Sequence, residues 1–136
     1  MEDIALLILR VVIGGLFVAH GAQKLFGAFG GHGLKGTAAF FEQIGLKPGY
    51  LMALSAGSAE FGGGLLVLVG FLTPLGALAI IATMVEAIAK VHAPNGLFNE
   101  NGGYEYNLVL IAVAAALILS GSGVYGLDAV LGILWQ

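Results

Sequence analysis

Long apolar stretches separated by short polar or glycine-rich segments dominate the chain, and they predict four membrane-spanning helices. These stretches cover residues 4–25, 48–71, 75–91 and 105–122. The first is roughly 22 residues long, so as a helix it measures about 33 Å and matches a hydrocarbon core of about 30 Å. Pro48 suits the first turn of the second helix, and the short Thr73–Pro74 link predicts that the third helix runs antiparallel to the second.

Two shorter segments have the pattern of helices that lie at a membrane surface. Between Thr37 and Ile44 the apolar residues follow the i, i+3, i+4, i+7 spacing of one helical face, with polar residues opposite. This segment is either an interfacial helix or a lid packed on the bundle without lipid contact. Residues 127–135 predict a second interfacial helix, with Trp135 at the depth of the lipid headgroups.

The composition agrees with a membrane location and limits the classes of function. Of the 136 residues, 59% are hydrophobic and 10% are charged, and the mean hydropathy is +0.99. A core of this size cannot hide so much apolar surface from water, so lipid is the expected solvent. A net charge of −3 without a basic stripe predicts no nucleic-acid partner. Because cysteine is absent, the chain has no disulfide and no thiol chemistry of its own.

Known metal and nucleotide motifs are missing from the sequence. Glutamates and histidines in a four-helix bundle suggest a di-iron carboxylate site, but such sites use Glu-x-x-His pairs and none occurs here. A bis-histidine haem would need His20 and His92 at matching depth on facing helices, which the pattern does not support. There is no P-loop, no nucleophile motif and no dinucleotide fingerprint after a strand. We therefore expect no metal site.

Ionisable side chains within the predicted spans carry the strongest functional signal. Charge is expensive in hydrocarbon, so each of them must face a partner, a cavity or the interface. At helical spacing Arg10 and Lys24 share one face of the first helix, and His20 lies on its flank. Glu60 is the one ionisable group of the second helix. We predict an ion pair between Arg10 and Glu60 inside the bundle.

Glu86 and Lys90 on the third helix stand in the i, i+4 order that favours an ion pair. Antiparallel packing puts them at the depth of His20 and Lys24, so we predict a cluster of these four side chains near one mouth of the bundle. Such a cluster suits the headgroup of a quinone, whose carbonyl oxygens need donors, while Glu60 relays protons. The alternative is a set of satisfied ion pairs that hold the helices in register.

Four spans put both termini on one side of the membrane and the 26–50 and 92–105 loops on the other. The loop side has Lys24, Lys35, Lys47 and Lys90, while the terminal side has Glu2, Asp3 and Asp128. The positive-inside rule therefore predicts that the long loops are cytoplasmic. His32 and His92 fall in these loops, and we expect plain surface roles for them.

Three runs of sequence resemble the DoxX family of small bacterial membrane proteins, most closely its CatD-type oxidoreductases. They are FVAHGAQKLFG, GHGLKGT and AEFGGGLLVLVGFLTP, and the likeness covers nearly the whole chain. The resemblance implies a four-helix bundle in the bacterial inner (plasma) membrane. By analogy with DoxD-type subunits of thiosulfate:quinone oxidoreductase, it also implies quinone-linked redox work with a soluble redox enzyme as partner.

Together these observations predict an all-α, polytopic membrane protein: one domain over residues 1–136, folded as a four-helix bundle with a short interfacial helix between helices 1 and 2. We expect a quinone-linked oxidoreductase subunit or a protein of quinone and redox stress. His20 and Glu60 are the expected catalytic residues, and Arg10, Lys24 and Glu86 the expected substrate-binding residues. The alternative is a non-enzymatic membrane scaffold or small-solute carrier that uses the same charges as a structural lock. Rows of small residues permit a homo-oligomer without requiring one.

Overall fold

The computed structural model describes residues 1–134, which contain helices and no strand. The longer helices are α1 (Glu2–Phe26), α2 (Gly33–Gln43), α3 (Gly49–Val69), α4 (Thr73–Ala87), α5 (Glu105–Ser120) and α6 (Leu127–Leu131). Short helical turns occupy the connections: η1 (Ala28–Gly30), the π-helical η2 (Ile88–His92), η3 (Ala93–Asn95) and η4 (Asn99–Asn101). The predicted all-α class is confirmed, whereas the predicted position of Trp135 lies outside the described residues.

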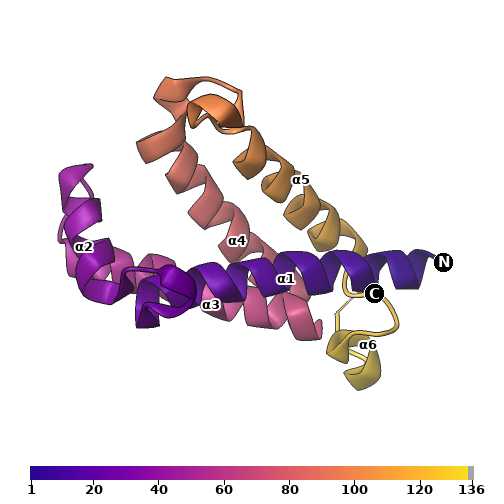
Figure 1. Ribbon diagram of the computed structural model, residues 1–136. Coiled ribbons are helices and arrows are strands. Elements are labelled where there is room, and N and C mark those ends of the chain that lie inside the picture. The colour runs from indigo at the N-terminus through magenta and orange to yellow at the C-terminus, as the bar shows by residue number, and fades with distance from the viewer. Residues whose placement is uncertain (135–136) are drawn as a thin grey trace.

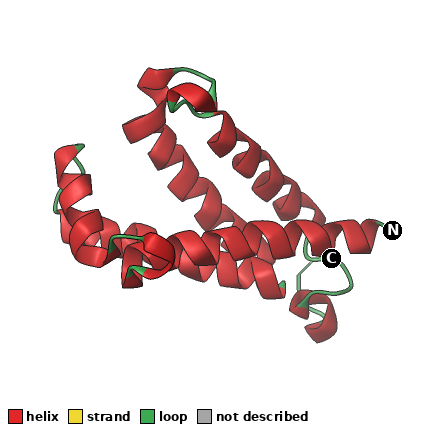
Figure 2. Ribbon diagram, viewed as in Figure 1, coloured by secondary structure: helices red, strands yellow, loops and turns green. Residues whose placement is uncertain are grey.

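Two antiparallel helix pairs form the body of the molecule (Figure 1). α1 packs along α3, α4 packs along α5, and contacts between α3 and α4 join the two pairs. Both termini lie at one end, where the pairs meet, and the pairs diverge toward the end that carries α2 and the α4–α5 loop. Loops occupy only short stretches between these helices (Figure 2).

Three helical segments are long and apolar enough to cross a membrane: Glu2–Phe26, Gly49–Val69 and Thr73–Asn95, the last continuing α4 through η2 and η3. α5 is also apolar, but its 16 residues correspond to about 24 Å, which is less than a hydrocarbon core of about 30 Å. Large apolar side chains such as Val12 and Leu119 are exposed on the outside of the bundle, as lipid contact requires. The structure thus supports a membrane protein, and the count of four spans stays a prediction.

Glycines bring the backbones of α1 and α3 into contact. A Cβ atom on Gly14 would lie 2.7 Å from the nitrogen of Leu68 and 2.8 Å from the carbonyl oxygen of Gly64. A Cβ atom on Gly64 would in turn lie 2.7 Å from the nitrogen of Val18. Small residues let membrane helices approach in this way. The contact fixes the register of the two helices and therefore the heights of their charged residues.

An apolar core fills the space between the two helix pairs at the end that carries the termini. Its buried members are Ile13, Phe17, Val67, Ala77, Ile80, Met84, Leu110, Ala114 and Leu117. Phe17, Met84 and Leu110 also line a cavity where the pairs diverge. The core therefore forms the floor of that cavity.

Candidate functional site

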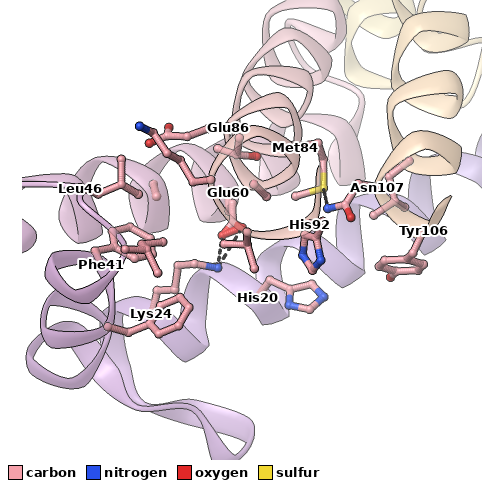
Figure 3. Close-up of a pocket in the computed structure, with 18 of the residues that line it drawn as sticks. His20, Lys24, Phe41, Leu46, Glu60, Met84, Glu86, His92, Tyr106 and Asn107 are labelled. Atoms are coloured by element: carbon pink, nitrogen blue, oxygen red, sulfur yellow. Dashed lines mark hydrogen bonds and ion pairs between the residues drawn. The ribbon is translucent and has the colours of Figure 1, made fainter. Parts of the chain in front are cut away.

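A cavity of about 400 Å³ lies between the helix pairs at the loop end (Figure 3). Residues from α1, α2, α3, α4, η2 and α5 line it, and most of the wall is apolar. The aromatic and aliphatic part of the wall includes Phe17, Phe40, Phe41, Ile44, Leu46 and Leu110. This volume falls within the range of about 300–1,000 Å³ typical of small-molecule sites.

Ionisable side chains from both helix pairs reach the same cavity. They are His20, Lys24, Glu60, Glu86, Lys90 and His92. Four of the five site residues predicted from the sequence are among them, while Arg10 is not. Since the remaining wall is largely apolar, this is a small number of polar groups around an apolar space, the usual arrangement of a ligand pocket.

Lys24 and Glu60 form an ion pair across the α1–α3 interface. Lys24 Nζ lies 2.5 Å from Oε1 and 3.1 Å from Oε2 of Glu60 (Figure 3). The Glu60 side chain is 4% exposed and that of Lys24 is 26% exposed. A buried carboxylate needs such a partner to remain charged. The ion pair therefore lies at the inner wall of the cavity, and Lys24 connects Glu60 to the mouth.

The predicted pair between Arg10 and Glu60 is wrong. Arg10 is 1% exposed and forms hydrogen bonds at the C-terminal end of α3, away from Glu60. Its Nε donates to the carbonyl oxygen of Ser122 at 3.0 Å, and its Nη1 donates to that of Leu68 at 3.0 Å. The last carbonyl groups of a helix have no partner within the helix, so the C-terminal end of α3 offers Arg10 closer acceptors than Glu60. Arg10 ties helices together and does not line the cavity.

Glu86 and Lys90 are both exposed at the mouth of the cavity. Over residues 1–134 the structure describes no ion pair between them. The sequence predicts an α-helix through residue 91, but α4 ends at Ala87 and the π-helical turn Ile88–His92 follows. A π-helical turn changes the angular offset between residues four apart, which removes the geometry on which the predicted pair depends. The same turn places Lys90, Val91 and His92 in the lining.

His92 was expected to have a surface role, but the structure places it, half-buried, in the cavity wall. Its Nδ1 lies 2.8 Å from the carbonyl oxygen of Gly102. A carbonyl oxygen only accepts hydrogen bonds, so Nδ1 must carry a proton, and Nε2 keeps its lone pair when the ring is neutral. The π-helical turn at Ile88–His92 places His92 there, and sequence spacing carries no signal of that turn.

Asn107 is a second polar residue of the cavity wall that was not expected from the sequence. It is 6% exposed, and its Nδ2 donates to the sulfur of Met84 at 3.4 Å. Asn107, Leu110, Ala114 and Leu117 form the buried stripe of α5 at helical spacing, so the signal was present in the sequence.

His20 stands between the polar and aromatic parts of the wall. It is half-buried, and its ring centroid lies 6.1 Å from that of Phe17. Among the described residues nothing hydrogen-bonds to its ring, so both of its nitrogens are available to a ligand. Over the same residues, the structure contains no group of three or more metal-ligating side chains that could hold an ion.

α2 covers the cavity from the side of the 26–50 loop. It begins at Gly33, earlier than the predicted Thr37, and packs against α1 and α3. Its Phe40 and Phe41 line both the main cavity and a smaller one of about 270 Å³. His32 lines the smaller cavity. Glu42 accepts a hydrogen bond from the backbone nitrogen of Gly49 at 3.1 Å, which anchors the end of α2 to the start of α3. This arrangement matches a lid packed on the bundle.

Comparisons with known proteins agree with the helical membrane fold. The DoxX family model matches residues 5–93. A Bacillus subtilis (strain 168) protein named "Putative oxidoreductase CatD" is 35% identical over 128 residues, which cover 93% of this chain and 86% of that protein. An Escherichia coli (strain K12) protein named "Inner membrane protein YqjF" is 29% identical over 135 residues, which cover 99% and 98%. No solved structure gives a significant match. The family match spans more than half of the chain, and the chain therefore belongs to the DoxX family.

Proposed function

We propose that this protein is the quinone-binding membrane component of an oxidoreductase system, and that the cavity between the two helix pairs holds the quinone headgroup. One observation carries the proposal. An aromatic-walled space at the end of apolar, membrane-length helices contains a partly buried ammonium–carboxylate pair and two histidines. A quinone ring is flat and apolar with polar oxygens at opposite edges, so it needs this combination of wall and polar groups.

Each polar residue has a role in this proposal. Interconversion of a quinone and a quinol transfers two electrons and two protons, so the site must exchange protons at the ring oxygens. Glu60 and His20 are the proposed proton-exchanging groups, since a carboxylate and an imidazole suit general acid–base work. Lys24 stabilises negative charge on a ring oxygen, and Glu86 at the exposed mouth connects the site to water. Arg10 has no part in binding.

The electrons would come from or go to a soluble redox enzyme that approaches the loop end. That end carries Lys24, Lys35, Lys47 and Lys90, so the positive-inside rule places it in the cytoplasm of a protein in the bacterial inner membrane. The names of two relatives, one an oxidoreductase and one an inner membrane protein, agree with this proposal.

Equilibrium dialysis with the detergent-purified protein tests the proposal. Ubiquinone-1 and 2,3-dimethyl-1,4-naphthoquinone represent the two common ring types, and we expect saturable binding of at least one of them. His20→Ala should weaken this binding, whereas His32→Ala should leave it unchanged because His32 lies in the smaller cavity. If neither quinone binds saturably to the folded protein, the proposal is rejected.

A non-enzymatic scaffold or carrier is the second candidate, and the ion contacts between helices favour it. Arg10 and the Lys24–Glu60 pair both join helices, as a purely structural lock would. This candidate predicts that His20→Ala changes neither stability nor ligand binding. The binding experiment on His20→Ala therefore separates the two.

A further inference from the structure

Several side chains around the cavity are held by other contacts in a way that leaves a hydrogen-bond acceptor for a ligand. His92 is the clearest case, because its Nδ1–H is committed to the carbonyl oxygen of Gly102 at 2.8 Å. The second ring nitrogen, Nε2, then has a lone pair and no proton in the neutral ring. A neutral His92 can therefore accept a hydrogen bond from a ligand but cannot donate one.

Asn107 adds another acceptor. Its amide nitrogen donates to the Met84 sulfur at 3.4 Å, since a thioether sulfur has no hydrogen to donate. One N–H of the amide is thereby used, and its second N–H and its oxygen have no partner among residues 1–134. That oxygen is an acceptor.

Glu60 supplies an acceptor on the opposite wall. Its carboxylate forms an ion pair with Lys24, and a carboxylate in an ion pair only accepts hydrogen bonds. A carboxylate offers about four lone-pair positions, and the single ammonium group of Lys24 cannot fill them all. The cavity thus has acceptors on the α1–α3 wall and on the α4–α5 wall.

The donors are less firmly held. The ammonium group of Lys24 is turned toward Glu60, and Lys90 and Tyr106 are exposed side chains of the lining. The Thr83 hydroxyl donates to its own helix, to the carbonyl oxygen of Ile80 at 2.9 Å. His20 can act as donor or acceptor because nothing fixes its tautomer.

We infer that the cavity recognises the reduced, dihydroxy form of the quinone, a hydroquinone, in preference to the oxidised dione. The inference rests on the proposed function and adds the redox state of the ligand. A hydroquinone has two hydroxyl donors at opposite edges of its ring, which match acceptors on the two facing walls. A dione has only acceptors at the same edges, so bound there it would face Glu60 and His92 without a hydrogen bond. An acceptor opposed by an acceptor loses the hydrogen bonds that it made to water.

Equilibrium dialysis of ubiquinol-1 and ubiquinone-1 under argon tests this inference on the unmodified protein. Two additional hydrogen bonds of about 0.5–1.5 kcal/mol each correspond to roughly tenfold tighter binding of ubiquinol-1. The 1,4-dimethyl ether of ubiquinol-1 has the same ring without the hydroxyl donors and should bind no tighter than ubiquinone-1.

His92→Asn provides the matched variant. The asparagine amide can still donate to the Gly102 carbonyl in place of Nδ1–H, but the acceptor at Nε2 is lost. We expect ubiquinol-1 to bind roughly three- to tenfold more weakly, while ubiquinone-1, which makes no hydrogen bond to Nε2, should not lose affinity. His32→Asn, the same substitution in the smaller cavity, is the control and should change neither affinity.

The outcomes separate the inference from the proposed function. Equal binding of the two forms, or tighter binding of ubiquinone-1, overturns the inference and leaves the quinone site in place. Failure of both forms to bind rejects both. The comparison on the unmodified protein decides the inference even if His92→Asn does not fold, and His92→Gln, with an acceptor oxygen near the position of Nε2, should keep part of the preference.

Discussion

Lys24 and Glu60 join the last turn of α1 to the middle of α3 through contacts of 2.5 and 3.1 Å. The two partners are unequally buried, since the Glu60 side chain is 4% exposed and the Lys24 side chain is 26% exposed. Lys24 can turn toward water when the pair is broken, but Glu60 cannot. Removal of Lys24 should therefore destabilise the protein more than removal of one partner of a surface ion pair would.

Removal of Lys24 should destabilise the fold. Lys24→Met leaves the buried Glu60 carboxylate without its counter-ion, which costs about 3–5 kcal/mol for a fully buried pair. Because Lys24 is a quarter exposed, we expect roughly 2–3 kcal/mol, measured by thermal unfolding in detergent micelles. Lys35→Met, at an exposed lysine of α2, is the control. Equal stability of the two variants would show that the pair contributes nothing.

Arg10 and Glu60 should act independently. Arg10 donates to carbonyl groups at the end of α3 and in the turn before α6, while Glu60 pairs with Lys24. Residues without a shared partner have additive effects within about 0.5 kcal/mol. A double-mutant cycle of Arg10→Ala and Glu60→Gln, followed by thermal unfolding, should therefore give no coupling energy beyond that limit. A larger coupling would support the direct pair that the sequence suggested.

Asp128 should stabilise the start of α4. Its Oδ1 accepts from the backbone nitrogen of Leu72 at 2.7 Å and its Oδ2 from that of Thr73 at 3.0 Å, so it satisfies donors that the first turn of α4 leaves free. Asp128→Ala should cost about 1–2 kcal/mol and should speed hydrogen exchange at these two amides. Asp3→Ala, which removes a more exposed contact to Val124 at the same end, should leave their exchange unchanged.

The class of fold and the positions of the charged residues along the bundle axis could be predicted from hydrophobic patterning. Helices near 4–25, 48–71 and 75–91 agree with the structure within a few residues, because runs of this length and hydropathy have few alternatives. Antiparallel packing of short-linked helices then places His20, Lys24, Glu60 and Glu86 around one end of the bundle.

Individual partners could not be predicted because they depend on backbone details that sequence spacing does not contain. Arg10 is satisfied by backbone carbonyl groups, which exist at every residue and leave no pattern. The π-helical turn at Ile88–His92 adds a residue to the helical turn, which brings His92 into the cavity and separates Lys90 from Glu86.

The orientation in the membrane can be tested with introduced cysteines, since the chain contains none. Glu2 and Glu100 are exposed at the terminal end and in the α4–α5 loop, respectively. In right-side-out membrane vesicles, a membrane-impermeant maleimide should label Glu2→Cys at once and Glu100→Cys only after permeabilisation. The reverse pattern would put the cavity mouth outside the cytoplasm and exclude a cytoplasmic redox partner.

Substitution by alanine should affect stability differently at two adjacent glycines of α1. A Cβ atom on Gly14 would lie 2.7 Å from the nitrogen of Leu68 and 2.8 Å from the oxygen of Gly64, so Gly14→Ala must push α1 away from α3. We expect a loss of about 1–3 kcal/mol in thermal unfolding, as for other overpacked sites. A Cβ atom on Gly15 would meet nothing within 4 Å. Gly15→Ala should therefore be neutral, or stabilising by up to about 1 kcal/mol, because alanine is the better helix former.

The same two variants show whether the α1–α3 contact positions the candidate site. Lys24 lies on α1 and Glu60 on α3, so a shift between these helices should weaken their pair as well as the packing. The double variant Lys24→Met, Glu60→Gln removes the pair. In this double variant, Gly14→Ala should therefore lower the free energy of unfolding by less than it does in the unmodified chain. Gly15→Ala should have the same effect in both proteins. An unchanged cost of Gly14→Ala would mean that the pair tolerates the shift and that the glycine contact serves packing alone.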